Sequence, residues 1–306
     1  MHALNLRSQE QEPQNSHQDL IEQLVFKVEQ RMLSLVRQAV GRKYQSEPLS
    51  TKAATYHLQS GGQRVRARLA LHAGKVLGLN REDAVALAAS AELLHNASLI
   101  HDDLQDQDYF RRGKKTVWSV FGSKVAICAG DLLLSAAYGS LAGLQDTRKL
   151  SKLLVLIHAR TAVVIGGQCG DLEAQSNPVS DVKSYEAIAA AKSGALLSLP
   201  LELVLIAADH EAAAIIGRRA CEAFAIGYQI ADDISDIHSD RGSAEKPAAL
   251  NIVFVHEAAG HGTNSLATSR QLGLEHLNEA RHLTYLLPKG SGDFLCELSL
   301  RLSEQL

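Results

Sequence analysis

Apolar residues that recur at helical spacing constrain the fold of this chain more than any other feature. From Asp19 onward, successive apolar residues are three or four positions apart, which places them on one face of a helix. The same spacing returns over residues 66–77, 82–104, 124–144, 149–170, 182–208 and 211–237. No segment alternates with period two for long enough to predict a sheet. Several segments are apolar nearly all round, which is typical of helices buried in a bundle, so the sequence predicts an all-α protein.

No Pro- or Gly-rich linker divides the 306-residue chain. We therefore expect one domain over residues 18–306, preceded by a disordered polar leader over residues 1–17. Residues 239–263 are predicted to form a loop with one short helix.

Composition argues against several classes of protein. The formal net charge of -3 gives no reason to expect a nucleic acid or an anionic membrane as partner. The four cysteines are scattered without a C-x-x-C pair, which is typical of reduced thiols in a cytoplasmic protein. Apolar runs such as LLSLPLELVLIAA are short and carry Glu202, so we expect no transmembrane segment.

Two aspartate clusters each end a long apolar segment. The pattern D-D-x-x-D occurs as Asp102, Asp103 and Asp106 and again as Asp232, Asp233 and Asp236. Acidic residues at a helix C-terminus oppose the helix dipole, so stability alone does not favour them there. One cluster could be a solvated helix end, but two facing clusters would repel each other unless cations lay between them. Converging carboxylates suit Mg²⁺, and a polyphosphate held by Mg²⁺ would bridge the clusters.

Basic residues could supply the other half of an anion site. Arg111 and Arg112 directly follow the first cluster, and Arg64 and Arg66 follow the glycine pair at 61–62. Neighbouring arginines suit diphosphate oxygens through forked hydrogen bonds, and glycine backbone N–H groups can face an anion. A solvated basic surface is the alternative interpretation.

Two further residues have two interpretations each. Lys192 is a lone cation in the small, apolar segment AAAKSGALL, where an unpaired charge would be expensive. It either binds an anion or extends to solvent. His95, which precedes the first cluster, is either a hydrogen-bond donor to an anion or a core histidine.

From about residue 50 to about residue 240 the chain resembles the trans-polyprenyl diphosphate synthases, the farnesyl and geranylgeranyl diphosphate synthase family. The matching segments are GGQRVRARL, LLHNASLIHDDLQDQDYFRRGKKTVWSVFG, AGDLLLSAA, GGQCGDLEA, AAAKSGALL and GYQIADDISDI. The resemblance implies the isoprenoid synthase fold, a bundle of about ten core helices around a deep central cavity. It also implies condensation of an allylic diphosphate with isopentenyl diphosphate, using about three Mg²⁺ ions. A homodimer is the family's habit.

The resemblance also assigns roles to residues. Both aspartate clusters would hold Mg²⁺. The residues expected to act in catalysis are Asp102, Asp103, Asp106, Asp232, Asp233 and Lys192. The residues expected to bind the allylic diphosphate are Arg111, Lys192, Ser193, Gln229 and Lys246. Those expected to bind isopentenyl diphosphate are Gln63, Arg66, His95 and Arg112. Gln168 and Asp171 match polar positions beside the path of the cation.

One departure from the family concerns Gln63, which stands where the family has a lysine. A charge-assisted hydrogen bond to isopentenyl diphosphate is lost, and such a bond is worth roughly 1.5–3 kcal/mol.

Product length depends on the residues before the first cluster. In this family a bulky aromatic residue there closes the cavity early, but here the positions are Ala97 and Ser98. The next bulky residue on that face is Leu94, roughly 12 Å along the helix from Asp102. We therefore expect a product of geranylgeranyl length or somewhat longer, with farnesyl as the shorter alternative.

Two other functions stay open. A terpene cyclase would use the same fold and metals without isopentenyl diphosphate, which Gln63 makes conceivable. A catalytically silent partner would regulate a synthase, but it would have no need for two clusters of close carboxylates.

Overall fold

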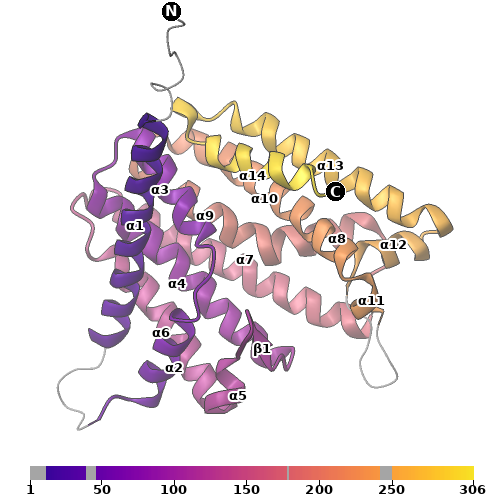
Figure 1. Cartoon of the computed structure of the whole chain (residues 1–306), viewed down its shortest axis with the longest axis horizontal. Coiled ribbons are helices and arrows are strands. Elements are labelled where there is room, and N and C mark those ends of the chain that lie inside the picture. The colour runs from indigo at the N-terminus through magenta and orange to yellow at the C-terminus, as the bar shows by residue number, and fades with distance from the viewer. Residues whose placement is uncertain (1–11, 39–45, 178, 242–249) are drawn as a thin grey trace, which may run out of the picture. The chain divides into compact units, whose positions relative to one another are not determined.

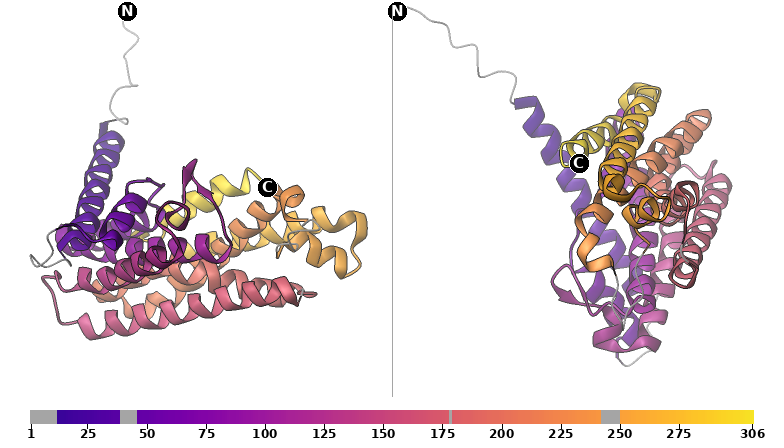
Figure 2. Two further views of the ribbon diagram at one scale, coloured as in Figure 1. Left: turned by 90° about the horizontal axis from the view of Figure 1, so that it is seen from below. Right: turned by 90° about the vertical axis from the view of Figure 1, so that its right-hand side faces the viewer.

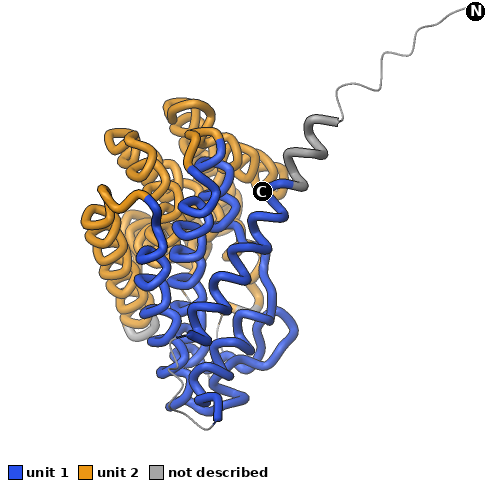
Figure 3. The backbone as a smooth tube through the Cα atoms, turned by 90° about the vertical axis from the view of Figure 1, so that its left-hand side faces the viewer, with its two compact units in different colours: residues 1–75, 80–145 blue, residues 76–79, 146–306 orange. Residues whose placement is uncertain are grey.

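The computed structural model describes residues 12–38, 46–177, 179–241 and 250–306. Helices form nearly all of the regular structure in these ranges (Figure 1), so the all-α prediction is confirmed. The chain divides into two compact units, which Figure 3 shows in different colours. Unit 1 comprises 1–75 and 80–145, and unit 2 comprises 76–79 and 146–306. No change of composition in the sequence indicates this division.

Unit 1 is built from helices around a central helix, α4. Apart from Val76 and Leu77 at the end of α3, its elements are α1 (Glu12–Gln38), α2 (Leu49–Leu58), α3 (Val65–Leu77), α4 (Arg81–Gln105), β1 (Phe110–Arg111), β2 (Lys114–Lys115), α5 (Val117–Phe121) and α6 (Ser123–Leu141). Residues 12–17 of the predicted leader belong to α1. Helix α4 packs against α1 and α6, and its residues are mostly buried, as its all-round apolar sequence predicts.

Acidic residues stabilise one end of α4 and destabilise the other. At the start, Asn80 Oδ1 accepts a hydrogen bond from Asp83 N at 2.8 Å, and the acidic first turn complements the helix dipole. The last turn contains Asp102 and Asp103 and no basic residue. The dipole therefore disfavours the charges at this end, and they depend on contacts outside the helix.

A short hairpin follows α4 and positions its basic neighbours. Strands β1 and β2 pair antiparallel with Arg111 opposite Lys114. Arg112 (φ 52°) and Gly113 (φ 73°) form the connection, and two successive positive φ values are typical of a type I′ turn. The sequence predicts no sheet, and these two short strands are the only strands in the described ranges.

Unit 2 is arranged around α10. Its elements are α7 (Leu150–Ser176), α8 (Val182–Ala189), the π-helical turn η1 (Ala190–Gly194), α9 (Ala195–Ala207), α10 (Glu211–Ser235), α11 (Ile237–Asp240), α12 (Ile252–Ala258), the 3₁₀ turns η2 (Gly262–Asn264) and η3 (Pro288–Gly290), α13 (Ser265–Thr284) and α14 (Asp293–Ser303). Helix α10 packs against α9 and α13, and α14 lies beside α13 (Figure 1). The predicted helix over 182–208 is present, with η1 interrupting its α-helical hydrogen bonding.

The charge inside the apolar helix α9 is paired. Glu202 is 3% exposed and accepts two hydrogen bonds from Arg160 on α7, both at 2.7 Å. Ser198 Oγ donates a third at 2.8 Å. Because an unpaired buried carboxylate would be strongly destabilising, this bidentate pair fixes α7 against α9.

Three helical segments are long and apolar enough to cross a membrane by length and composition alone: Ser123–Leu141, Leu150–Ala174 and Val182–Ala207. The prediction that the apolar runs are too short to span a membrane is therefore wrong in its premise. The helical segment continues through Lys192 and Glu202 and reaches spanning length. Val182–Ala207 is 72% buried inside the protein, whereas Leu150–Ala174 is 22% buried. Figure 2 shows α7 as one long helix along the edge of unit 2. The cytoplasmic location stays a prediction.

Candidate active site

The first aspartate cluster lies at the end of α4 in unit 1. Asp103 is only 1% exposed, and its Oδ1 accepts a hydrogen bond from Arg111 Nε at 2.5 Å. Arg111 Nη2 also lies 3.6 Å from Asp102 Oδ2, so one guanidinium group bridges two aspartates. Asp106 caps the helix, with its N–H bonded to Asp102 O.

On each of the three aspartates, one buried carboxylate oxygen accepts no hydrogen bond within the described part of the chain. Asp103 Oδ2 is buried and accepts no hydrogen bond there. Burial raises the pKa of Asp103 to about 6, and the charge and hydrogen bond of Arg111 oppose that rise. A cation beside Oδ2 would supply the missing interaction, so the donor set fits a hard divalent ion.

The hairpin directs Arg112 away from Arg111. Arg112 Nη1 donates a hydrogen bond to Gly61 O, in the turn that follows α2. A Cβ atom at Gly62 would lie 2.5 Å from Arg112 Nη1, so any larger residue would force this guanidinium group to move. The glycine pair predicted to expose backbone N–H groups therefore also provides space for a side chain.

The predicted isopentenyl diphosphate residues all lie in unit 1. Burial, then the charges of Arg66 and Arg112, lowers the pKa of His95 well below its ordinary value. The charges of both arginines therefore act on His95, which is neutral. Gln63 is exposed next to Gly62 in the same turn. Three of the four predicted residues are therefore close enough to interact electrostatically.

Arg64 does not join this group. It is 6% exposed, its Nε donates to Glu29 Oε1 at 2.9 Å, and its Nη2 donates to Leu58 O at 2.9 Å. The interpretation that Arg64 offers forked hydrogen bonds to a diphosphate is wrong, because the guanidinium group is buried between α1 and α2.

The predicted chain-length residues lie along α4. Leu94 and Ala97 are buried, at 3% and 2% exposure, while Ser98 is partly exposed and donates from Oγ to His95 O at 2.8 Å. Ser98 is therefore the position at which a larger side chain could be accommodated without displacing the core.

The second aspartate cluster lies at the end of α10 in unit 2. Asp233 is 2% exposed, whereas Asp232 and Asp236 are exposed. Burial raises the pKa of Asp233 to about 6, opposed by hydrogen bonds from Gln229, Ile252 N and Tyr185. Burial, then the charges of Asp236 and Asp240, raises the pKa of Asp232.

Lys192 is not the lone cation that the sequence suggests. Its Nζ donates to Asp171 Oδ2 at 2.5 Å, from the π-helical turn η1 to α7. The backbones approach closely here, since a Cβ at Gly167 would lie 2.5 Å from Lys192 N. The partner is 21 residues earlier on another helix, so helical spacing could not reveal it.

A small pocket within unit 2 lies beside Lys192 and beside Tyr185 and Gln229, which donate hydrogen bonds to Asp233. It measures about 40 Å³ and is lined by Asp171, Tyr185, Ile188, Ala189, Lys192, Gln229 and Leu250. The predicted residues Lys192, Asp171 and Gln229 are therefore neighbours, and Ser193 adjoins Lys192. Lys246 lies outside the described residues.

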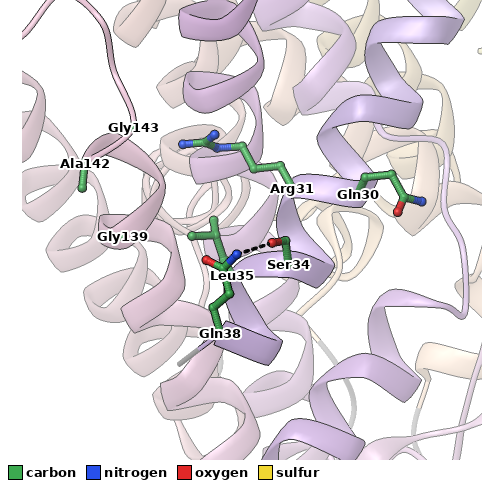
Figure 4. A pocket seen from close by; sticks show the side chains of 8 residues that line it. All are labelled: Gln30, Arg31, Ser34, Leu35, Gln38, Gly139, Ala142 and Gly143. Carbon is green, nitrogen blue, oxygen red and sulfur yellow. Dashed lines mark hydrogen bonds between the residues drawn. The ribbon is translucent and has the colours of Figure 1, made fainter. Parts of the chain in front are cut away.

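A pocket of about 550 Å³ in unit 1 holds none of the predicted residues. It lies between α1 and the end of α6, lined by Gln30, Arg31, Ser34, Leu35, Gln38, Gly139, Ala142 and Gly143 (Figure 4). Arg31 donates to Ser140 Oγ at 3.0 Å and to Ser140 O at 2.7 Å, which ties the two helices together.

Across the described ranges, no three His, Cys, Asp or Glu side chains form a complete metal site. Mg²⁺ usually keeps several waters and takes one or two carboxylates with substrate phosphates. The arrangement fits an ion that a phosphate ligand would help to hold.

Comparison with known proteins gives a consistent result. The family model for polyprenyl synthetase matches residues 47–252. A short chain isoprenyl diphosphate synthase of Methanocaldococcus jannaschii is 32% identical over 65% of this chain and 61% of its own length. A farnesyl diphosphate synthase of Geobacillus stearothermophilus is 31% identical over 81% of this chain and 86% of its own.

A solved structure shows the same fold. The geranylgeranyl pyrophosphate synthetase of the archaeon Geoglobus acetivorans superposes with a TM-score of 0.79 at 22% identity, covering 93% of this chain and 99% of that one. Several sequence relatives are aligned over less than two thirds of their own length, as with the 61% above.

Acidification should destabilise the protein through His57. Burial, then the charges of Arg112 and Arg111, lowers the pKa of this histidine to about 3. Between that value and its ordinary pKa of about 6.5, the unfolded state binds more protons, so stability falls as pH falls. Urea unfolding of the wild type should lose about 2 kcal/mol more between pH 7 and pH 5 than that of His57→Gln. Equal losses in both proteins would contradict this assignment.

Proposed function

The chain belongs to the polyprenyl synthetase family, and we propose that it is a Mg²⁺-dependent prenyltransferase that joins an allylic diphosphate to isopentenyl diphosphate. The observation on which the proposal rests is that two neighbouring arginines contact different parts of unit 1. Arg111 contacts the first aspartate cluster, whereas Arg112 contacts the glycine turn near Arg66 and His95. One hairpin therefore serves two separate anion positions, as two diphosphate substrates require.

The aspartate clusters would hold the metal. Carboxylate oxygens are the ligands that Mg²⁺ prefers, and the uncompensated Asp103 Oδ2 supports a cation there. When bound, Mg²⁺ would neutralise the allylic diphosphate and make it a better leaving group. Arg111, Lys192, Ser193 and Gln229 would bind the same diphosphate. The assignment of Lys246 rests on sequence alone.

The second diphosphate would lie against Arg66, His95 and Arg112, with Gln63 at the edge. Neutral His95 can donate one hydrogen bond to an oxygen without adding charge. In the reaction the allylic C–O bond breaks, and the double bond of isopentenyl diphosphate attacks the allylic cation. One proton then leaves to the released diphosphate. The apolar helices would keep water from the cation.

A product assay tests the function. Incubation with Mg²⁺, farnesyl diphosphate and labelled isopentenyl diphosphate should yield labelled, longer prenyl diphosphates. Asp102→Ala and Asp232→Ala should each reduce turnover by at least about a hundredfold, because each removes a carboxylate that holds the metal. Circular dichroism should show unchanged helix content in both variants.

Other outcomes identify the alternatives. Unlabelled hydrocarbon or alcohol would indicate a cyclase, and absence of turnover on any allylic diphosphate would indicate a silent partner. Full activity of either aspartate variant would contradict the metal assignment.

We propose a product of geranylgeranyl length or somewhat longer. The basis is the small side chains of Ala97 and Ser98 on α4, with Leu94 further along the helix. Ser98→Phe should shorten the main product by at least one isoprene unit, because the ring would occupy the path of the growing chain. Chromatography of dephosphorylated products measures this, and Ser98→Thr serves as the control of similar size. An unchanged product from Ser98→Phe would show that other residues set the length.

We propose that the protein is a homodimer joined through α7. The helix exposes Val155 (68%), Val163 (42%) and Ile165 (56%), and a second copy would cover them. Light scattering should give twice the 33.0 kDa chain mass, and Ile165→Glu should shift it toward the monomer. Leu300→Glu, at an exposed apolar position on α14, should leave the mass unchanged. A monomeric wild type would reject the proposal.

A further inference from the structure

Three donors from three helices of unit 2 converge on the carboxylate of Asp233. Tyr185, 1% exposed on α8, donates from its hydroxyl to Oδ2 at 2.7 Å. The backbone N–H of Ile252, at the start of α12, donates to the same oxygen at 2.8 Å. Gln229, one turn earlier on α10, donates from Nε2 to Oδ1 at 2.8 Å. A carboxylate offers about four lone-pair positions, so most of the accepting capacity of Asp233 is already used.

Asn251 connects the same segments through its amide group and is 1% exposed. Its Nδ2 donates to the backbone oxygen of Asp233 at 2.7 Å and to Asp240 Oδ2 at 3.0 Å. Its Oδ1 accepts from Val253 N at 2.9 Å and so caps α12. One side chain therefore ties the end of α10 to α11 and to the first turn of α12.

These contacts matter because the end of α10 is electrostatically unfavourable. Asp232, Asp233 and Asp236 stand at the negative end of the helix dipole, together with Asp240 on α11. No Lys or Arg lies in the last turn of α10. Neutral donors hold Asp233 in place without cancelling the charge of the cluster, which stays available to attract cations.

We propose that Tyr185 and Asn251 are positioning residues that hold Asp233 as a buried anchor and thereby present Asp232 and Asp236 to a divalent cation. The inference rests on the proposed function of the aspartate clusters and refines it. Asp233 fixes the geometry, and its exposed neighbours meet the metal. Residues that hydrogen-bond to metal-binding groups often change metal affinity as strongly as ligands do.

The anchor also explains why the two positioning residues are so far apart in the sequence. Tyr185 comes before α9 and α10, and Asn251 comes after α11, yet both reach Asp233. The orientation of the cluster is therefore set by the packing of α8 and α12 around α10. It is not set by α10 alone.

Calorimetric binding of inorganic diphosphate at two fixed concentrations of free Mg²⁺ tests the proposal. Tyr185→Phe removes one hydroxyl, and Asn251→Ser keeps a capping oxygen while removing the amide donors. Each variant should weaken diphosphate binding about tenfold at the lower Mg²⁺ concentration and recover part of the loss at the higher one. Recovery by Mg²⁺ is a response that a general loss of stability would not produce.

Ser269→Ala is the matched control. Ser269 is fully buried on α13 of the same unit, and its hydroxyl bonds to His256 Nδ1 and Ser265 O at 2.8 Å each. This variant should lower the melting temperature and bind diphosphate like the wild type. Wild-type affinity in Tyr185→Phe and Asn251→Ser, at whatever melting temperature, would overturn the inference alone. A wild type that binds no diphosphate with Mg²⁺ would overturn the proposed function and this inference with it.

Discussion

Carboxylates at the C-terminal ends of two apolar helices are the constraint on which the candidate site depends. The helix dipole, burial and mutual repulsion all oppose these charges. In both clusters the middle residue of the pattern, Asp103 or Asp233, is almost completely buried. Each buried carboxylate therefore needs compensation from a later segment of the chain. Asp103 is compensated by the hairpin after α4, and Asp233 by the first residue of α12.

The two clusters are compensated by different chemistry. Asp103 is paired with the guanidinium group of Arg111, which cancels one negative charge, and it keeps one unsatisfied oxygen. Asp233 is held by the neutral donors of Tyr185, Gln229 and Ile252 N. The cluster on α10 thus retains more of its negative charge, so it has the stronger need for a cation. A ligand that brings several cations would therefore bind best at the second cluster. At the first cluster, Arg111 could bind an anion.

The sequence predicted what periodicity and local spacing encode. The helices α3, α4, α6, α7 and α10 follow from their apolar pattern, and both aspartate clusters follow from a repeated spacing. What it missed depends on contacts between distant residues. Asp171 neutralises Lys192 from 21 positions earlier, and Glu29 lies 35 positions before its partner Arg64. The roles of Tyr185 and Asn251 could not be found either, because a buried tyrosine and a capping asparagine are ordinary residues until their neighbours are known.

The glycine pair at 61–62 shows how a local pattern can be identified correctly and its role still be incomplete. Gly61 (φ 84°) and Gly62 (φ 138°) both occupy backbone conformations that favour glycine, as a turn requires. Arg112 uses the space that a side chain at position 62 would fill, and Gly61 O accepts its hydrogen bond. Replacing Gly62 with any other residue would therefore strain the turn and displace the guanidinium group of Arg112. The same substitution would alter the surroundings of His95, because the positive charge of Arg112 helps to lower the pKa of this histidine. The turn that the sequence predicts to offer backbone N–H groups to an anion thus also holds Arg112, as a structural part of the proposed anion site.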